Sequence, residues 1–281
     1  MKIGLALSGG GIKGAAHIGV LQAFEENNLK IHMISGASSG SIVAALYSAK
    51  FTPKEIYKFF KKYAKDIKYA DFSNILQLIL GILTGDGITI TGLSKGNSLE
   101  KNIRKECLKR NIQNIKDINF PLYISSVNLM NGVTYIFNNS KSKTYQNFKM
   151  VNDIDIATAV RASCSYPGVF EPVKWNGSTF VDGGIRENTP WEVLKIEGAD
   201  ETISVTFKDI SKKNCDKNLI SVIDCSLGYL NNELKDYEMQ GNDKTIEIRT
   251  QDIGLLEYNK VDELYQIGYQ TANKFCKKFI K

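Results

Sequence analysis

The sequence has few of the side chains that bind metal ions or act as general bases. Its 281 residues include two histidines, His17 and His32, and five cysteines, none of which forms a C-x-x-C pair. Without such pairs or a histidine cluster there is no metal motif, and we expect neither a metal nor another cofactor. An odd number of cysteines among lysine, glutamate and asparagine favours free thiols in a reducing compartment.

Long hydrophobic runs are also missing. No apolar stretch approaches the ~18 residues of a membrane-spanning helix, and the longest, Ile75 to Leu83, is interrupted by Gln77 and Gly81. The first residues, which lead directly into Gly9, do not resemble a signal peptide. We therefore expect a cytoplasmic protein without a nucleic-acid partner. The net charge of +6 is compatible with peripheral contact with an anionic membrane surface.

The first fifty residues predict two consecutive strand–helix units. Ile3–Leu7 and Ile31–Ser35 are short apolar runs typical of buried strands, and they are followed by the helical patterns Lys13–Asn27 and Ser39–Ala49. Such alternation is characteristic of an α/β fold with a parallel sheet. The two strands are expected to be neighbours.

The rest of the chain adds one antiparallel feature to this pattern. Asn131-Gly132 separates two apolar runs and predicts a hairpin. We therefore expect a mostly parallel central sheet with antiparallel additions, in a single domain over residues 1–281. Further expected elements are helices at Pro53–Lys65, Phe72–Leu83, Lys95–Arg110, Ile154–Ser163, Leu219–Leu230 and Val261–Ile280, strands at Leu122–Leu129, Val133–Phe137, Thr179–Asp182, Thr202–Phe207 and Thr245–Arg249, and a loop at Gly81–Gly96.

A nucleophile motif lies between the second strand and its helix. Gly36-Ala37-Ser38-Ser39-Gly40 fits G-x-S-x-G, in which a serine occupies a sharp strand-to-helix turn and the flanking glycines let strand and helix approach closely. The helix N-terminus would place N–H groups beside Ser38, where they would favour a developing oxyanion. The alternative is a tight turn of small residues without chemistry.

A glycine-rich loop follows the first strand. Gly9-x-Gly11-x-x-Gly14 satisfies the dinucleotide-binding pattern, but that use requires an acidic residue at the end of the second strand. No acid stands there, and Ala15 after Gly14 excludes a P-loop. Consecutive glycines can instead direct backbone N–H groups at one point, as in an oxyanion hole. A dinucleotide-binding protein remains the alternative.

The general base cannot be the histidine of an α/β-hydrolase triad. That triad has the chain order Ser, acid, His, and no histidine follows Ser38. A rearranged triad with His32 is a weaker alternative, because that residue lies several positions before the turn. Asp182 ends a predicted strand and precedes Gly183-Gly184, which would let a partner approach closely. It is the best candidate for the base.

Together these residues resemble the patatin-like phospholipase family. Three blocks match in order: Ser8–Gly14, Gly36–Gly40 and Asp182–Gly184; the segment Arg161–Pro172 supports them, and Asn188-x-Pro190 follows as expected. The resemblance covers roughly residues 1–200. It implies a three-layer α/β fold with helices on both faces of the sheet, and a Ser38–Asp182 dyad that works without histidine.

The resemblance also implies the remaining site residues. The oxyanion loop would comprise Gly9, Gly10, Gly11, Lys13 and Gly14, and Gly36 and Gly40 would shape the elbow. Two positions depart from the family pattern: Ser8 stands where the loop usually begins with Asp, and Lys13 replaces an Arg. Both changes keep the backbone donors, although lysine lacks the planar fork of arginine.

The activity implied is hydrolysis of lipid acyl esters of the phospholipase A or lysophospholipase kind, through an acyl-enzyme on Ser38. A catalytically silent module of the same family is an alternative, which intact Ser38 and Asp182 argue against. Phe72–Leu83 is a candidate wall or lid for the acyl chain, with a core helix as the alternative.

Pro53–Lys68 combines a lysine face with an aromatic face. This pattern is compatible with docking on anionic lipid, or with a core helix whose lysines are solvated. The lysines are Lys54, Lys58, Lys61, Lys65 and Lys68, and the opposite face carries Ile56, Phe59, Phe60, Tyr63 and Ile67.

Overall fold

The fold is built on one large mixed sheet. The computed structural model describes residues 1–66, 71–84, 89–208, 215–216, 219–250, 253–254 and 257–279. The strands of the main sheet are β1 Ile3–Leu7, β2 Met33–Gly36, β4 Leu122–Asn128, β5 Thr134–Asn138, β6 Lys143–Thr144, β7 Phe148–Val151, β9 Val173–Trp175, β10 Ser178–Asp182, β11 Glu201–Lys208 and β12 Lys244–Arg249. Two short strands, β3 Gly92–Ser94 and β8 Gly168–Phe170, pair separately.

The sheet order is β12-β11-β1-β2-β4-β5-β7-β6. The strands from β12 to β4 are parallel, whereas β5 and β10 pair with β4 in the antiparallel direction. The predicted parallel neighbours β1 and β2 and the hairpin at Asn131-Gly132 are thus confirmed. All five residues of β1 are buried, as expected for a central parallel strand covered on both faces.

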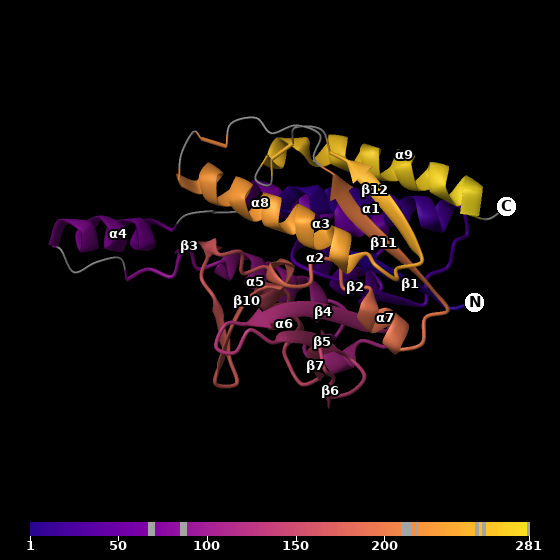
Figure 1. The fold of residues 1–281 in the computed structure, drawn as a ribbon, viewed down its shortest axis with the longest axis horizontal. Helices are drawn as coiled ribbons and strands as arrows, with labels where there is room; N and C mark the ends of the chain where they lie inside the picture. The colour runs from indigo at the N-terminus through magenta and orange to yellow at the C-terminus, as the bar shows by residue number, and fades with distance from the viewer. Residues whose placement is uncertain are drawn as a thin grey trace.

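Helices cover both faces of this sheet, so the three-layer α/β expectation is confirmed (Figure 1). Leu5 and Leu7 of β1 pack in the core that contains the helices α1, α2 and α9, whereas Ala6 faces the opposite core with Val193 and Leu194 of α7. The helices are α1 Gly14–Glu26, α2 Ser39–Ser48, α3 Pro53–Asp66, α4 Phe72–Thr84, α5 Asn97–Leu108, α6 Ile156–Ser163, α7 Glu192–Ile196, α8 Leu219–Glu238 and α9 Val261–Phe279.

Helix α4 projects away from the body of the molecule, at the left of Figure 1. Phe72 is 80% exposed, and Leu76 and Leu80 are 43% and 48% exposed. Its first turn is attached to the rest of the protein by the buried side chain of Asn74, which donates to the carbonyl of Gly92 at 2.9 Å. The core-helix alternative for Phe72–Leu83 is therefore not supported, because the apolar side chains of Phe72, Ile75, Leu76 and Leu80 are exposed.

Helix α3 is a core helix with a solvated lysine face. Ile56, Phe60 and Tyr63 are buried, whereas Lys54 and Lys58 are exposed. Lys61 pairs with Asp262 of α9 at 2.7 Å. The predicted positions Ile67 and Lys68 lie outside the described residues.

Two expectations require correction. The loop predicted at Gly81–Gly96 contains the end of α4 and the strand β3, although 85–88 lie outside the described residues. The cysteines are not all free thiols: Cys215 and Cys225 form a disulfide with a Cα–Cα distance of 5.6 Å. Their spacing matches no recognised motif, so the sequence pattern does not indicate the pairing. The other cysteines, Cys107, Cys164 and Cys276, are free and buried.

In the part of the chain that the structure describes, no helix combines the length and the apolar character needed to cross a membrane.

The contact between α1 and α9 depends on two glycines. A Cβ at Gly268 would lie 2.0 Å from the carbonyl oxygen of Ala16, and one at Gly19 would lie 2.1 Å from that of Tyr265. Both helix backbones therefore approach more closely than any side chain permits. This contact fixes α1, whose N-terminus carries the glycine-rich loop.

We predict that Gly268→Ala lowers the free energy of unfolding by about 1–3 kcal/mol, because the added methyl group meets backbone that cannot rotate away. Gly228→Ala on α8 is the matched control, since no atom of the described residues lies within 4 Å of its Cβ position. Helix propensity alone should leave that variant up to about 1 kcal/mol more stable. Urea unfolding of both variants measures the difference, and equal midpoints would contradict the prediction.

Candidate active site

Strand β4 brings Ser38 and Asp182 together. The first half of β4 pairs with β2, so that Gly36 lies opposite Ile124. The second half pairs with β10, so that Asp182 lies opposite Ser126. Because β5 occupies the other edge of β4, β2 and β10 share one edge and their ends face each other. The two predicted catalytic residues therefore meet.

Ser38 has a strained backbone at the turn from β2 to α2. Its φ of 48° and ψ of −124° lie in a region that residues with a side chain rarely adopt. The turn is tight enough to require both elbow glycines: a Cβ at Gly36 would lie 2.5 Å from the backbone of Gly40, and one at Gly40 would lie 2.3 Å from the carbonyl of Leu7. The N–H of Ser38 donates to Ser163 Oγ at 2.9 Å.

The glycine-rich loop packs directly on this elbow. A Cβ at Gly14 would lie 2.7 Å from the Cβ of Ser39, and one at Gly9 would lie 3.1 Å from the Cβ of Ser38. Gly11 has a φ of 56°, which a glycine adopts without strain. The loop that precedes α1 and the turn that precedes α2 thus form one surface beside the Ser38 side chain.

Several backbone N–H groups of the glycine-rich loop already have a hydrogen-bond acceptor within the protein. The N–H of Gly9 donates to Asn188, that of Lys13 to the carbonyl of Gly10, and that of Gly14 to the turn before it. Within the described residues, no acceptor is found for the N–H groups of Gly10 and Gly11. These two remain the donor candidates, whereas Gly9 contributes its lack of a side chain, which corrects its expected role.

Asp182 is a buried carboxyl group held by backbone. Its Oδ1 accepts from the N–H of Gly184 at 2.8 Å, and its own N–H donates to the carbonyl of Ser165 at 3.0 Å. Burial raises the pKa of Asp182 to about 7, against the opposing effects of the Ser38 hydroxyl and the Gly184 N–H. Oδ2 has no direct hydrogen-bond partner in the described part of the chain. This oxygen can therefore accept a proton from a neighbouring group.

Neither histidine reaches Ser38. His17 donates from Nε2 to the carbonyl of Ser8 at 2.8 Å, and burial lowers its pKa to about 4. His32 accepts the N–H of Ile3 at 3.1 Å, which places it at the opposite end of β1 from the glycine loop. The structure therefore gives no support to a rearranged triad.

Cys164 is a neighbour of Ser38 that the sequence did not indicate. Burial raises the pKa of this thiol, with a further contribution from Asp182, whereas the hydroxyls of Ser41 and Ser38 act in the opposite direction. The thiol is therefore protonated and inert as a nucleophile at neutral pH. Its sulfur lies 3.8 Å from Ser41 Oγ, and the only sequence signal was its place in the segment Arg161–Pro172.

Arg161 connects several parts of that segment through hydrogen bonds. Arg161 is 2% exposed, and its guanidinium donates to Ser165 Oγ at 2.7 Å and to the carbonyls of Lys95 and Glu171 at 2.7 and 2.8 Å. Because the carbonyl of Ser165 in turn accepts from the N–H of Asp182, the arginine connects Asp182 to the N-terminus of α5.

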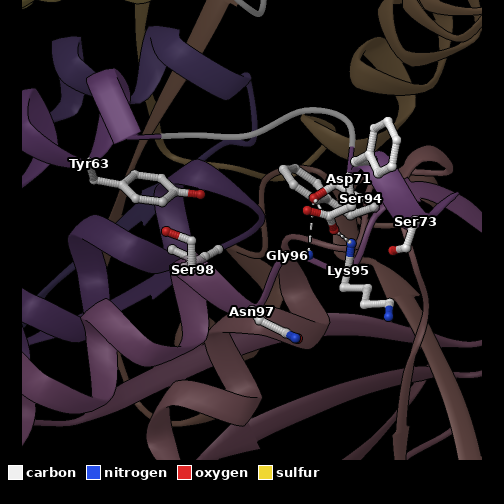
Figure 2. Close-up of a pocket in the computed structure, with 11 residues that line it drawn as sticks. Tyr63, Asp71, Ser73, Ser94, Lys95, Gly96, Asn97 and Ser98 are labelled. Carbon is white, nitrogen blue, oxygen red and sulfur yellow. Dashed lines mark hydrogen bonds between the residues drawn. The ribbon is translucent and has the colours of Figure 1, made fainter. Parts of the chain in front are cut away.

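A cavity of about 260 Å³ lies above Arg161, where a Cβ at Gly96 would contact the guanidinium at 2.3 Å. Figure 2 shows Tyr63 of α3 pointing across this cavity toward the group formed by Asp71, Ser94 and Lys95. Phe72, at the start of the helix considered above as a candidate wall for the acyl chain, lines this cavity. Its lining includes neither Ser38 nor Asp182. The full lining is Tyr63, Asp71, Phe72, Ser73, Ser94, Lys95, Gly96, Asn97, Ser98, Leu99 and Phe170.

Among the described residues, no group of three histidine, cysteine or acidic side chains is placed to hold a metal ion.

The fold and this site define a class of α/β proteins in which a serine occupies a strained elbow beside a glycine-rich loop. A family model for patatin-like phospholipases matches residues 5–195. The Bacillus subtilis protein YqhO, of uncharacterised function, is 30% identical over 230 residues, which are 78% of this chain and 76% of that protein. The chain belongs to the patatin-like phospholipase family.

Fungal proteins named lysophospholipase NTE1 are also similar to the chain. Identity is 29% over 203 residues with the protein of Saccharomyces cerevisiae, covering 72% of this chain and 10% of that protein. With the protein of Meyerozyma guilliermondii the identity is 28% over 211 residues, which cover 75% of this chain and 13% of that protein. The chain thus spans only a small part of these relatives.

Two solved structures share the fold. VipD from Legionella pneumophila has a TM-score of 0.54 at 15% identity, and the match covers 99% of this chain and 67% of VipD. ExoU in its complex with SpcU, from Pseudomonas aeruginosa, has a TM-score of 0.51 at 18% identity, covering 99% and 51%.

The raised pKa of Asp182 makes its effect on stability depend on pH. Between about pH 4 and pH 7 the folded protein retains a proton on Asp182 that the unfolded chain has lost, so this residue progressively destabilises the fold as pH rises. We predict that Asp182→Asn raises the Tm at pH 8 by about 2 °C or more, and that the gain disappears near pH 4.

Asp153→Asn is the control for this measurement. The ammonium group of Lys116 lowers the pKa of Asp153, so the same substitution there should not stabilise the protein at pH 8. The Tm of both variants and of the wild type is measured by thermal unfolding at pH 8 and pH 4. A Tm for Asp182→Asn at or below the wild-type value at pH 8 would contradict the prediction.

Proposed function

We propose that the protein hydrolyses acyl esters of lipids through a Ser38–Asp182 dyad. The observation that carries this proposal is the meeting of a strained serine with a buried carboxyl group whose pKa lies near 7. A base that is ionised at neutral pH yet still basic is suited to take a proton from a hydroxyl group. The names of the fungal relatives support a lipid substrate of the lysophospholipase kind.

The first step forms an acyl-enzyme. Ser38 Oγ attacks the ester carbonyl, and its proton passes to Asp182 Oδ2. The N–H groups of Gly10 and Gly11 stabilise the oxyanion, together with the N-terminus of α2. As the tetrahedral intermediate collapses, the bond to the alcohol breaks and the leaving oxygen takes the proton from Asp182.

The second step releases the fatty acid. A water molecule gives its proton to Asp182 and attacks the acyl carbonyl, and the bond to Ser38 Oγ breaks as the serine recovers a proton. No third side chain orients the base in this scheme. The Gly184 N–H on Oδ1 serves that purpose, and it leaves Oδ2 directed to the reaction.

We predict that Ser38→Ala and Asp182→Asn each reduce turnover of medium-chain p-nitrophenyl esters by at least about 10³-fold. Fluorophosphonate labelling should disappear in Ser38→Ala. Ser48→Ala is the matched control, because Ser48 is a buried serine of the same helix whose hydroxyl has no partner among the described residues. Normal turnover by folded Ser38→Ala would refute the proposed nucleophile.

We further propose that α4 contacts the lipid surface that holds the substrate. Phe72, Leu76 and Leu80 present apolar side chains to solvent, and α4 carries no charged residue. The exposed lysines of the preceding helix α3, such as Lys58, would face anionic headgroups. Burying one leucine side chain stabilises such contact by about 1.5–3 kcal/mol.

Leu80→Glu tests this contact, because it replaces an apolar side chain with an anionic one. We predict a loss of at least about tenfold in binding to phosphatidylglycerol-containing vesicles, measured by co-sedimentation. Leu108→Glu at the end of α5 is the matched control, since Leu108 is 49% exposed and Leu80 is 48% exposed. Equal binding by the two variants, or no binding by the wild type, would reject α4 as the membrane contact.

A further inference from the structure

Asn188 connects the glycine-rich loop to the segment that follows Asp182. The N–H of Gly9 donates to both the backbone oxygen and the side-chain Oδ1 of Asn188, each at 3.1 Å. Gly9 directly precedes Gly10 and Gly11, the two candidate oxyanion donors. The position of these donors is therefore tied to a residue beyond the base.

The Asn188 side chain occupies the space between the two loops. A Cβ at Gly9 would lie 2.6 Å from Asn188 Oδ1, and one at Gly184 would lie 2.8 Å from the same atom. Gly9 is also the residue whose Cβ would approach Ser38. Asn188 thus sets the distance between the oxyanion loop and the loop that orients Asp182.

Glu238, the last residue of α8, holds this segment from the other side. Its Oε1 accepts from the N–H of Asn188 at 2.7 Å, and its backbone oxygen accepts from the indole N–H of Trp191. One turn earlier, Lys235 pairs with Glu247 of β12 at 3.3 Å. The C-terminal turn of α8 is therefore fixed to the sheet and to residues 188–191 together.

Two physical effects oppose a carboxylate at this position. The C-terminal end of a helix carries partial negative charge, which disfavours an acidic side chain. Burial also disfavours ionisation and raises the pKa of Glu238 to about 7, although the N–H groups of Asn188 and Thr189 act against this. Oε2 has no partner within the described residues. The contact with the 188–189 backbone is what offsets these costs.

On the basis of the proposed function, we propose that Glu238 is a positioning residue for the oxyanion loop. By accepting the N–H of Asn188, it fixes the asparagine whose two oxygens hold Gly9, and thereby places the N–H groups of Gly10 and Gly11 relative to Ser38. It contacts no reacting atom. The competing explanation is that Glu238 only terminates α8 and affects stability alone.

The two explanations predict different kinetics. An oxyanion interaction is stronger in the transition state than in the bound substrate, so a displaced donor lowers kcat and leaves KM nearly unchanged. A small displacement of a catalytic group is enough to reduce the rate by about tenfold to a hundredfold. A purely structural residue would change the Tm without this selective loss of kcat.

The test uses three substitutions at one position. Glu238→Ala removes the acceptor of the Asn188 N–H. Glu238→Asp keeps the charge, but its side chain is one methylene group shorter and the carboxylate lies farther from Asn188. Glu238→Gln keeps an oxygen acceptor at the position of Oε1. With a soluble p-nitrophenyl ester, Glu238→Ala and Glu238→Asp should lose about tenfold or more in kcat at nearly constant KM. Glu238→Gln should retain most of the activity. Glu233→Ala, an exposed glutamate on the same helix, should match the wild type.

Hydrogen exchange of the peptide that contains Gly9 gives a readout that needs no turnover. Exchange should be faster in Glu238→Ala than in Glu233→Ala or the wild type, because the Gly9 N–H loses its fixed acceptor. If wild-type turnover is absent, the proposed hydrolase function fails and exchange alone decides the coupling. If Glu238→Ala does not fold, the comparison of Glu238→Asp with Glu238→Gln decides it.

Three results would overturn the proposal: wild-type kcat in folded Glu238→Ala, equal impairment of Glu238→Gln and Glu238→Asp, or unchanged exchange at Gly9.

Discussion

The site depends on one backbone constraint, the positive φ of Ser38. A serine adopts this conformation only where its surroundings enforce it. Here the turn is closed by two glycines, because a Cβ at Gly36 would meet the backbone of Gly40 and one at Gly40 would meet the carbonyl of Leu7. The same close packing brings the β1 loop against the elbow. The strained turn and the glycine loop are therefore two halves of one packing arrangement.

That arrangement explains why the central strands occur in the order β1-β2-β4. Parallel neighbours end at the same edge of the sheet, so the loop after β1 and the turn after β2 meet there. β4 is long enough to pair with β2 along its first half and with β10 along its second. A shorter β4 would leave Asp182 without a strand to bring it to Ser38.

The sequence was sufficient for the parts of the fold that follow fixed spacings. G-x-S-x-G, the glycine loop and the Asp-Gly-Gly turn are local patterns, and each lies at the end of the strand where its pattern predicts it. Glu238 was not predictable, because its contact with Asn188 joins residues 50 positions apart through tertiary packing alone. The exposure of α4 was also hidden, since an apolar helix has the same sequence pattern in a core and on a surface. The pairing of Cys215 with Cys225 was not predictable either, because the ten-residue separation of the two cysteines matches no recognised motif.

The proposed dyad without histidine imposes a further requirement on the chain. In a triad, a third side chain orients the base; here backbone groups orient Asp182, through the N–H of Gly184 and the carbonyl of Ser165. The glycine-rich loop is likewise held by backbone and by Asn188, only six residues after Asp182. The proposed base and the proposed oxyanion donors are thus positioned by one short segment, 182–190. A displacement of this segment would move both together, which is why its attachment to α8 matters as much as the identity of the two proposed catalytic side chains.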